Sequence, residues 1–258
     1  MRRRSRRERK GVAGVPTIGE ELRRGLARDE LAVQFQPIVR TSDEVPVGLE
    51  ALVRWMRPGE GVVPAAGFLE AADGADLLHQ VDHRTIELVA RDVARARLPA
   101  RLKWISVNVA SRSLEHLEVR ERLEGLAGEL GRYELGLVVE LTDRDGDLDR
   151  DHARAMSAGL RSSGMQVALD GFGRSTALFD RILDVPADVV KIDAGMRTDG
   201  DPLLPDADGY LRALVRLSHW LDRTVVVTGV ESRPSLGGSA VGEADFAQGF
   251  YFGRPGFL

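Results

Sequence analysis

The 258-residue sequence contains no cysteine. This absence excludes disulfide bridges and thiolate metal sites, so a chain of this length must be held together by its own hydrophobic core. The sequence also contains no run near the roughly 20 apolar residues that a membrane-spanning helix requires. The apolar stretch after the basic start is too short and too broken for a secretion signal. We therefore expect a cytoplasmic protein with no membrane span.

Charge is unevenly distributed along the chain. The net charge is −4, but the first ten residues carry six arginines and Lys10 against one glutamate, which leaves about −10 for the remainder. A basic tail could contact nucleic acid or anionic lipid, yet this one has neither aromatic residues nor an amphipathic pattern. These features favour a disordered tail over residues 1–18. The acidic remainder, residues 19–258, is expected to form one domain without a nucleic-acid-binding groove.

Short apolar runs alternate with amphipathic segments over most of the chain. The pattern predicts strands at 31–39, 45–55, 105–109, 137–141, 167–170, 189–192, 224–227 and 246–248, and helices at 20–28, 78–96, 114–130, 153–160, 177–183 and 211–221. A turn at 41–44 pairs the first two strands as an antiparallel hairpin. The later alternation predicts an α/β fold, a (β/α)8 TIM-like barrel with one antiparallel strand from that hairpin. The alternative, an open doubly wound sheet, lacks a Gly-rich phosphate loop after its first strand.

Six predicted strands carry a polar residue in or just after their C-terminal half, and the carboxyl ends of parallel strands meet at one face. These residues are Glu50, Asn108, Glu140, Asp170, Lys191 and Thr228. A single carboxylate at a strand end more often caps a helix or pairs with an arginine. Four converging oxygen-bearing side chains favour a metal site instead. The first four residues form an all-oxygen set, which suits Mg²⁺, Mn²⁺ or Ca²⁺.

The basic residues near these strand ends allow several interpretations. Lys191 could be a solvated strand end, a contact to phosphate or to an attacking water, or a Schiff-base nucleophile. Three nearby carboxylates would raise its pKa, which disfavours a Schiff-base aldolase. Arg54 could form a salt bridge with Glu50 or clamp a phosphate. The five histidines, which are interpreted as surface or packing residues, are His79, His83, His116, His152 and His219.

Seven motifs, in order along the chain, resemble those of the EAL-domain cyclic-di-GMP phosphodiesterases. They are Glu50-Ala-Leu with Arg54, Val107-Asn-Val, Glu140-Leu-Thr-Asp143, Asp170-Gly-Phe-Gly, Lys191-Ile-Asp193, Val227-Thr-Gly-Val-Glu231 and Ala247-Gln-Gly-Phe-Tyr-Phe-Gly-Arg-Pro255. The resemblance covers roughly residues 20–258. It implies a (β/α)8 barrel that binds cyclic di-GMP and, in active members, uses two Mg²⁺ or Mn²⁺ ions to hydrolyse it to linear pGpG.

The resemblance also implies a role for each matching residue. Glu50, Asn108, Glu140 and Asp170 match the ligands of the first metal ion, and Lys191 matches the lysine near the attacked phosphate. The residues expected to contact the bound ligand are Gln36, Arg54, Asp193 and Gln248.

The departures from the family pattern concern the second metal ion. Gly171 and Thr228 stand where the family has carboxylates, Asp143 replaces a glutamate, and the loop 174–178 differs. Two ions about 3.5–4 Å apart need carboxylates to offset their repulsion, so one Mg²⁺ or Mn²⁺ site is expected and the second is doubtful. The resemblance then implies a degenerate, inactive or weak member that acts as a cyclic-di-GMP receptor or as an interaction module for an unidentified signalling protein. The alternative is an active phosphodiesterase, and dimer formation is left open because the loop is altered.

Overall fold

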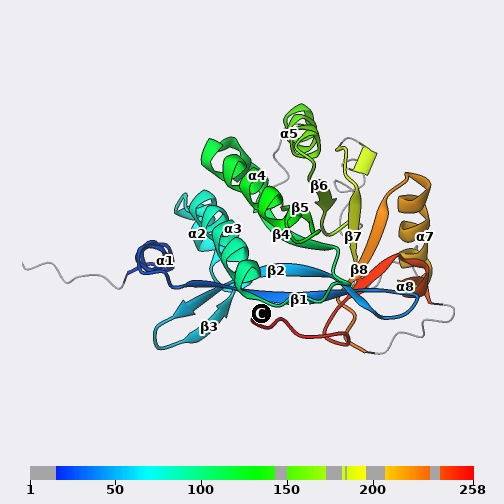
Figure 1. Ribbon diagram of the computed structural model, residues 1–258, viewed down its shortest axis with the longest axis horizontal. Coiled ribbons are helices and arrows are strands. Elements are labelled where there is room, and N and C mark those ends of the chain that lie inside the picture. Colours follow the sequence, from blue (N-terminus) through cyan, green and yellow to red (C-terminus); the bar gives the residue numbers. More distant parts are fainter. Residues whose placement is uncertain (1–15, 143–149, 173–181, 184, 196–206, 233–238) are drawn as a thin grey trace, which may run out of the picture.

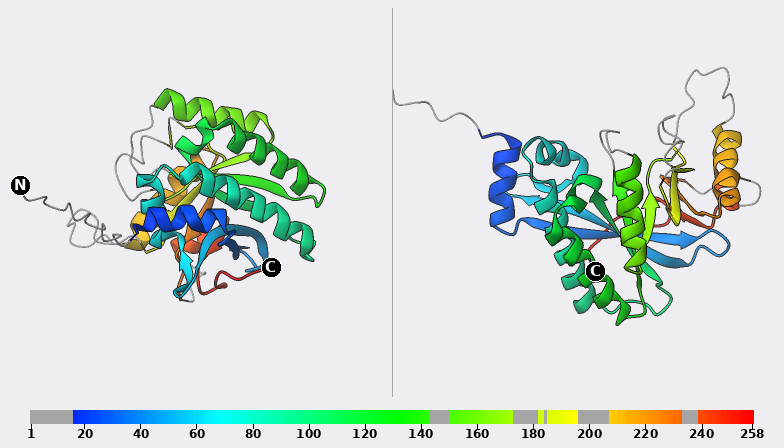
Figure 2. Two further views of the ribbon diagram at one scale, coloured as in Figure 1. Left: turned by 90° about the vertical axis from the view of Figure 1, so that its left-hand side faces the viewer. Right: turned by 90° about the horizontal axis from the view of Figure 1, so that it is seen from above.

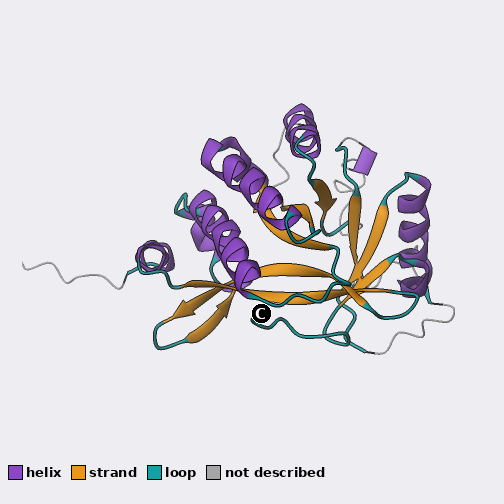
Figure 3. Ribbon diagram, in the orientation of Figure 1, coloured by secondary structure: helices purple, strands orange, loops and turns teal. Residues whose placement is uncertain are grey.

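The computed structural model describes residues 16–142, 150–172, 182–183, 185–195, 207–232 and 239–258. Its strands form one sheet, with helices on the outside (Figures 1 and 3). The strands are β1 (Leu31–Arg40), β2 (Pro46–Arg57), β3 (Gly61–Pro64), β4 (Trp104–Ala110), β5 (Gly136–Thr142), β6 (Gln166–Leu169), β7 (Val189–Asp193), β8 (Thr224–Thr228) and β9 (Phe246–Gln248).

Eight of these strands close into a barrel. Their order is β1-β9-β8-β7-β6-β5-β4-β2, and β2 pairs again with β1. Strand β1 is antiparallel to both of its neighbours, whereas the other neighbouring pairs around the ring are parallel. The predicted (β/α)8 barrel with one antiparallel strand is therefore confirmed. The short strand β3, which was not predicted, extends the sheet beyond the ring by pairing with β2.

Helices surround much of this ring. They are α1 (Ile18–Ala27), α2 (Leu69–Gly74), α3 (Leu78–Arg95), α4 (Leu117–Gly131), α5 (Arg150–Ser162), α7 (Ala207–Trp220) and α8 (Ala240–Glu243), with 3-10 turns η1 (Ala65–Gly67) and η2 (Ser111–Glu115). Helices α3 and α4 lie side by side, as the two views of Figure 2 show, and they pack on β1, β4 and β5. The C-terminal segment returns along β1, where Phe35 and Gly256 exchange backbone hydrogen bonds.

Several predicted boundaries differ from those in the structure. Helix α1 begins at Ile18 rather than residue 20, because Thr17 and Glu20 form a capping box at its start. Thr17 and Ile18, the last residues of the tail predicted over 1–18, therefore belong to the start of α1. Residues 1–15 lie outside the described part. Helix α4 begins at Leu117 rather than residue 114, because η2 occupies the intervening turn. Most of the helix predicted at 177–183 also lies outside the described residues.

The barrel interior, at the end where the parallel strands begin, holds an apolar cluster that lines a pocket of about 650 Å³. Its buried residues are Ile38, Val138, Ala168, Val189 and Val226. Trp104 and Phe246 pack against this group edge to face, with ring centroids 4.8 Å apart. Gly48 makes that packing fit, because a Cβ there would lie 2.3 Å from Cε2 of Trp104. The opposite end, where the parallel strands finish, carries the polar residues.

Within the described residues, no helix is both long and apolar enough to cross a membrane.

Candidate active site

Lys191 is the centre of a buried charged network at the carboxyl end of the barrel. Its Nζ donates to Oε2 of Glu50 at 2.8 Å and to Oε2 of Glu140 at 2.7 Å. The Nδ2 of Asn108 donates to Oε1 of Glu50 at 2.8 Å. These residues lie on β7, β2, β5 and β4, and the parallel register places Asn108 directly beside Glu140. The structure thus brings together three of the four predicted metal ligands and the predicted lysine.

Asp170 is the fourth predicted ligand, and it follows β6 directly. It is exposed, unlike Glu50 and Glu140, and its Oδ1 accepts from the backbone N–H of Gly171 at 2.8 Å. It lines the same pocket as Glu50 and Lys191. The set therefore consists of the buried carboxylates of Glu50 and Glu140, the half-buried amide of Asn108 and one carboxylate that reaches solvent.

The protonation states in this network follow from burial and from neighbouring charges. Burial and the adjacent Glu50 carboxylate raise the pKa of Glu140 to about 7, although Lys191 partly offsets them. Burial would also raise the pKa of Glu50, but the Lys191 ammonium outweighs it, so this pKa falls below its ordinary value. Burial alone would lower the pKa of Lys191, yet the carboxylates of Glu140, Glu50 and Asp170 raise it instead. Lys191 is therefore held as an ammonium ion, which excludes the Schiff-base role at neutral pH.

Two glutamines complete the base of the network on the β1 and β9 side. The Nε2 of Gln248 donates to Oε2 of Glu50 at 2.7 Å and to Oε1 of Gln36 at 3.2 Å. The Nε2 of Gln36 donates to the carbonyl of Gly253 at 3.0 Å. The Oε1 atom of Gln248 is buried and accepts no hydrogen bond from the described residues. Because buried polar atoms are nearly always paired, this acceptor indicates a place where a ligand or water would donate.

A pocket of about 550 Å³ opens above this network. Its lining residues are Gln36, Glu50, Asp170, Lys191, Thr228, Gly229, Glu231, Gln248, Gly249 and Phe250. Phe250 is 48% exposed, and the guanidinium of Arg254 lies 4.4 Å from its ring centroid. The pocket therefore offers a cationic base, carboxylates on one wall and an aromatic ring on another.

Two predicted ligand contacts lie away from this pocket's lining. Arg54 donates from Nε to Oε1 of Gln34 at 2.8 Å and from Nη1 to the carbonyl of Val53 at 3.0 Å, so its guanidinium is directed along β1 and β2. Asp193 accepts at Oδ1 from the backbone N–H of Gly195 at 2.8 Å. A Cβ at Gly229, whose φ is +73°, would lie 2.7 Å from that same Oδ1. Asp193 therefore packs against the backbone that follows β8.

Gly171 directly follows Asp170, and Thr228 lines the same pocket as Asp170. Gly171 has a φ of +71° and no side chain to offer. The Oγ1 of Thr228 makes a long contact, 3.5 Å, to the carbonyl of Ile192. Asp143 and residues 174–178, which the sequence also singles out, lie outside the described residues.

The donor set fits one divalent cation. Carboxylate and amide oxygens suit Mg²⁺ or Mn²⁺, and Asn108 would present its carbonyl oxygen after rotating its amide group. Three carboxylates and one ammonium leave two negative charges for such an ion to neutralise. Among the described residues that line the pocket, Glu231 is the carboxylate that follows β8 and Thr228, and it is exposed. Among the described residues, four oxygen-bearing side chains are therefore available for a first ion, and positions 171 and 228 add no carboxylate for a second.

Two residues of functional interest were not singled out from the sequence. Phe250 lies within a recognised motif, but only the fold shows that its ring borders the pocket. Asp82 of α3 is buried and accepts from the backbone N–H of Ala110 at 2.9 Å, just beyond Asn108. In the sequence, Asp82 falls on the apolar face of an amphipathic helix, and this pattern could have indicated a buried acidic residue.

Comparison with known proteins agrees with this architecture. Residues 19–255 match the sequence model of the EAL domain. The probable cyclic di-GMP phosphodiesterase PdeN of Escherichia coli is 28% identical over 92% of this chain and 46% of its own length. The cyclic di-GMP phosphodiesterase PdeR of the same organism is 29% identical over 92% of this chain and 36% of its own length. This chain thus spans less than half of these curated relatives.

Solved structures give the same result. The PaMucR phosphodiesterase in complex with c-di-GMP superimposes with a TM-score of 0.72 at 25% identity, covering 93% of this chain and 97% of that one. The FimX EAL domain from Pseudomonas aeruginosa, bound to c-di-GMP, gives a TM-score of 0.75 at 23% identity and covers 94% of this chain and 98% of that one. At 23% identity, the similarity to the FimX EAL domain is evidence for the fold alone.

Proposed function

The chain belongs to the EAL domain family, and we propose that it binds cyclic di-GMP in the pocket above Lys191 and hydrolyses it weakly or not at all. It would then act in cyclic-di-GMP signalling as a receptor or as an interaction module for another signalling protein. The observation that carries this proposal is the contrast within the pocket. Glu50, Asn108, Glu140 and Asp170 keep four oxygen-bearing side chains for a first ion, whereas Gly171 and Thr228 provide no carboxylate for a second ion.

Ligand binding is supported by groups that suit a cyclic dinucleotide. Lys191 lines the pocket as an ammonium ion and can attract a phosphodiester. The unpaired Oε1 of Gln248 can accept from an N–H group. Phe250 offers an exposed ring, and stacking of a base on an aromatic side chain contributes about 1–3 kcal/mol.

Weak turnover follows from the number of ions that the site can hold. A divalent ion bound by Glu50, Asn108, Glu140 and Asp170 would polarise a phosphodiester oxygen and help to activate water. The protein itself would orient the phosphate with Lys191 and keep Glu50 in its ionised form through that same lysine. Removal of a single group that stabilises charge in a transition state typically costs about 10²–10³ in rate, and the loss of a whole ion should cost more.

An active phosphodiesterase is the second candidate. Glu231 favours it, because this carboxylate lines the pocket near Thr228 and is exposed enough to move. In that case Glu231 and Asp170 together would have to hold the second ion.

Hydrolysis of cyclic di-GMP in Mn²⁺ tests the choice between these functions. The matched control is Glu140→Gln, which removes a buried ligand and reveals any contaminating phosphodiesterase. We expect the wild-type rate to exceed the control rate by little or not at all. A wild-type rate near ~1 s⁻¹, within the usual range for enzymes, with a silent control would establish the active alternative.

Calorimetric titration with cyclic di-GMP, in Ca²⁺ and separately in EDTA, tests the receptor function. Phe250→Ala should weaken binding about fivefold to 150-fold, as expected from the loss of one stacked base. Phe257→Ala is the matched control, because Phe257 is also exposed but lies outside the pocket lining. If the wild type bound no cyclic di-GMP in either buffer, the receptor function would be refuted. The role as an interaction module would then be the remaining function.

A further inference from the structure

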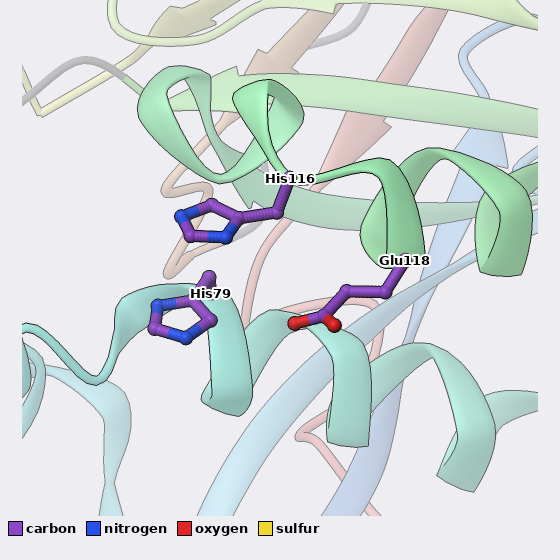
Figure 4. A group of neighbouring side chains, drawn as sticks. All are labelled: His79, His116 and Glu118. Carbon is purple, nitrogen blue, oxygen red and sulfur yellow. The ribbon is translucent and has the colours of Figure 1, made fainter.

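A second group of ligand-type side chains lies on the outside of the barrel (Figure 4). His79 is in the first turn of α3, His116 directly precedes α4, and Glu118 is in the first turn of α4. One ligand atom from each lies within 4.8 Å of the other two. The imidazole rings are stacked, with centroids 4.1 Å apart and an interplanar angle of 5°. The residues are distant in sequence and meet because α3 and α4 pack side by side.

We propose that His79, His116 and Glu118 bind a divalent transition-metal ion of borderline softness, Zn²⁺ or Ni²⁺. Two imidazole nitrogens and one carboxylate oxygen are typical ligands of such ions, whereas the barrel site offers mainly oxygen atoms and suits Mg²⁺ or Mn²⁺. Water would occupy a fourth position. The inference does not depend on the ligand of the barrel, because none of its residues lines that pocket.

The surroundings of the cluster favour a cation. His79 and His116 line a pocket of about 390 Å³ together with Asp73, Asp76, Leu78, Arg112 and Glu115. Three of these side chains are acidic, and Arg112 is paired with Asp73 at 2.7 Å. The starts of α3 and α4 oppose the cation through their dipoles, but that effect is weak at an exposed position and is screened by salt. The acidic surplus therefore determines the sign of the local potential.

Only small movements are needed for coordination. Zinc lies about 2.0–2.1 Å from a histidine nitrogen, so the two rings must tilt from their parallel stack to direct one nitrogen each at a shared point. His116 and Glu118 are exposed and can rotate, whereas His79 is half-buried and holds its position. The ion would then connect the starts of α3 and α4.

Zinc titration of the full chain, with Mg²⁺ in excess to occupy the barrel site, tests the proposal. Calorimetry gives the affinity, and Co²⁺ absorption in the visible range reports whether nitrogen ligands are present. His79→Gln and His116→Asn should each weaken binding by at least about tenfold, because loss of even an outer-shell partner costs 10–100-fold. Asn is chosen at position 116 because it is well tolerated at the start of a helix.

His83→Gln is the matched control, because His83 lies one turn further along α3 and outside the cluster. Wild-type affinity in both cluster variants, or an equal loss in the control, would overturn the proposal. A readout that needs no variant is protection from diethyl pyrocarbonate in the wild-type chain. Zinc should protect His79 and His116 but not His83, and modification of all three at unchanged rates would refute the site even if a variant failed to fold.

Discussion

Asp82 should make the stability of this protein fall as the pH rises. Burial raises the pKa of its carboxyl to about 7 from the ordinary value of 3.8, although the N–H of Ala110 partly stabilises the ionised form. In the unfolded chain the carboxyl has its ordinary pKa. Between these two values the folded protein holds a proton that the unfolded chain has released, so folding is favoured at low pH and loses this advantage as the pH rises through about 7.

The size of the effect follows from the difference of about three pKa units. Each unit corresponds to 1.36 kcal/mol, so Asp82 should remove about 4 kcal/mol of unfolding free energy between pH 4 and pH 8. The slope should approach roughly 1.4 kcal/mol per pH unit in the middle of that range. Asp82→Asn removes the titration and keeps an oxygen that can accept from Ala110.

The assay is urea unfolding of the wild type and the variant at a series of pH values. All other titrating groups act in both proteins, so the difference between the two curves isolates Asp82. We expect the wild type to lose stability relative to the variant as the pH rises. Parallel curves, or a wild type that gains on the variant with rising pH, would show that the buried carboxyl is not held in its protonated form.

The other predictions concern positions 171 and 228 and the packing of the barrel. Gly171→Asp together with Thr228→Glu should raise Mn²⁺-dependent hydrolysis of cyclic di-GMP. Either change alone should do little, because each leaves the second ion with too few ligands. Additive effects of the two changes on the hydrolysis rate would contradict this prediction. Gly48→Ala should destabilise the fold by about 1–3 kcal/mol, because the new methyl group clashes with Trp104. Gly128→Ala is its control in thermal unfolding, since nothing lies within 4 Å of a Cβ there and alanine favours a helix.

The barrel could be predicted because its strands are short apolar runs whose spacing leaves few topologies. The positions of Glu50, Asn108, Glu140 and Lys191 followed from the same rule, since parallel strands end at one face. The sequence did not reveal that Lys191 would contact both glutamates, because the direction of a side chain inside a barrel depends on strand stagger.

The features that sequence reasoning missed depend on contacts between distant segments. Arg54 was interpreted as a partner of Glu50 or a clamp for a phosphate, and its contact with Gln34 on the neighbouring strand depends on the hairpin register. The histidines were interpreted as surface or packing residues one at a time. His79 and His116 form a cluster only because two helices lie side by side, and no local pattern carries that information.

Charge balance supports the proposal that this site binds one ion. Glu50, Glu140 and Asp170 against Lys191 leave two negative charges, which one divalent ion neutralises. Arg54 and Glu231 have opposite signs and both reach solvent, so they leave this balance unchanged. A second ion would place two uncompensated positive charges beside Lys191. Asp at 171 and Glu at 228 would restore the balance, and the backbone permits the first change, because Asp29, Asp76 and Asp222 already adopt φ near the +71° of Gly171. The barrier to a second ion is therefore expected to lie in two missing side chains and not in the path of the barrel backbone.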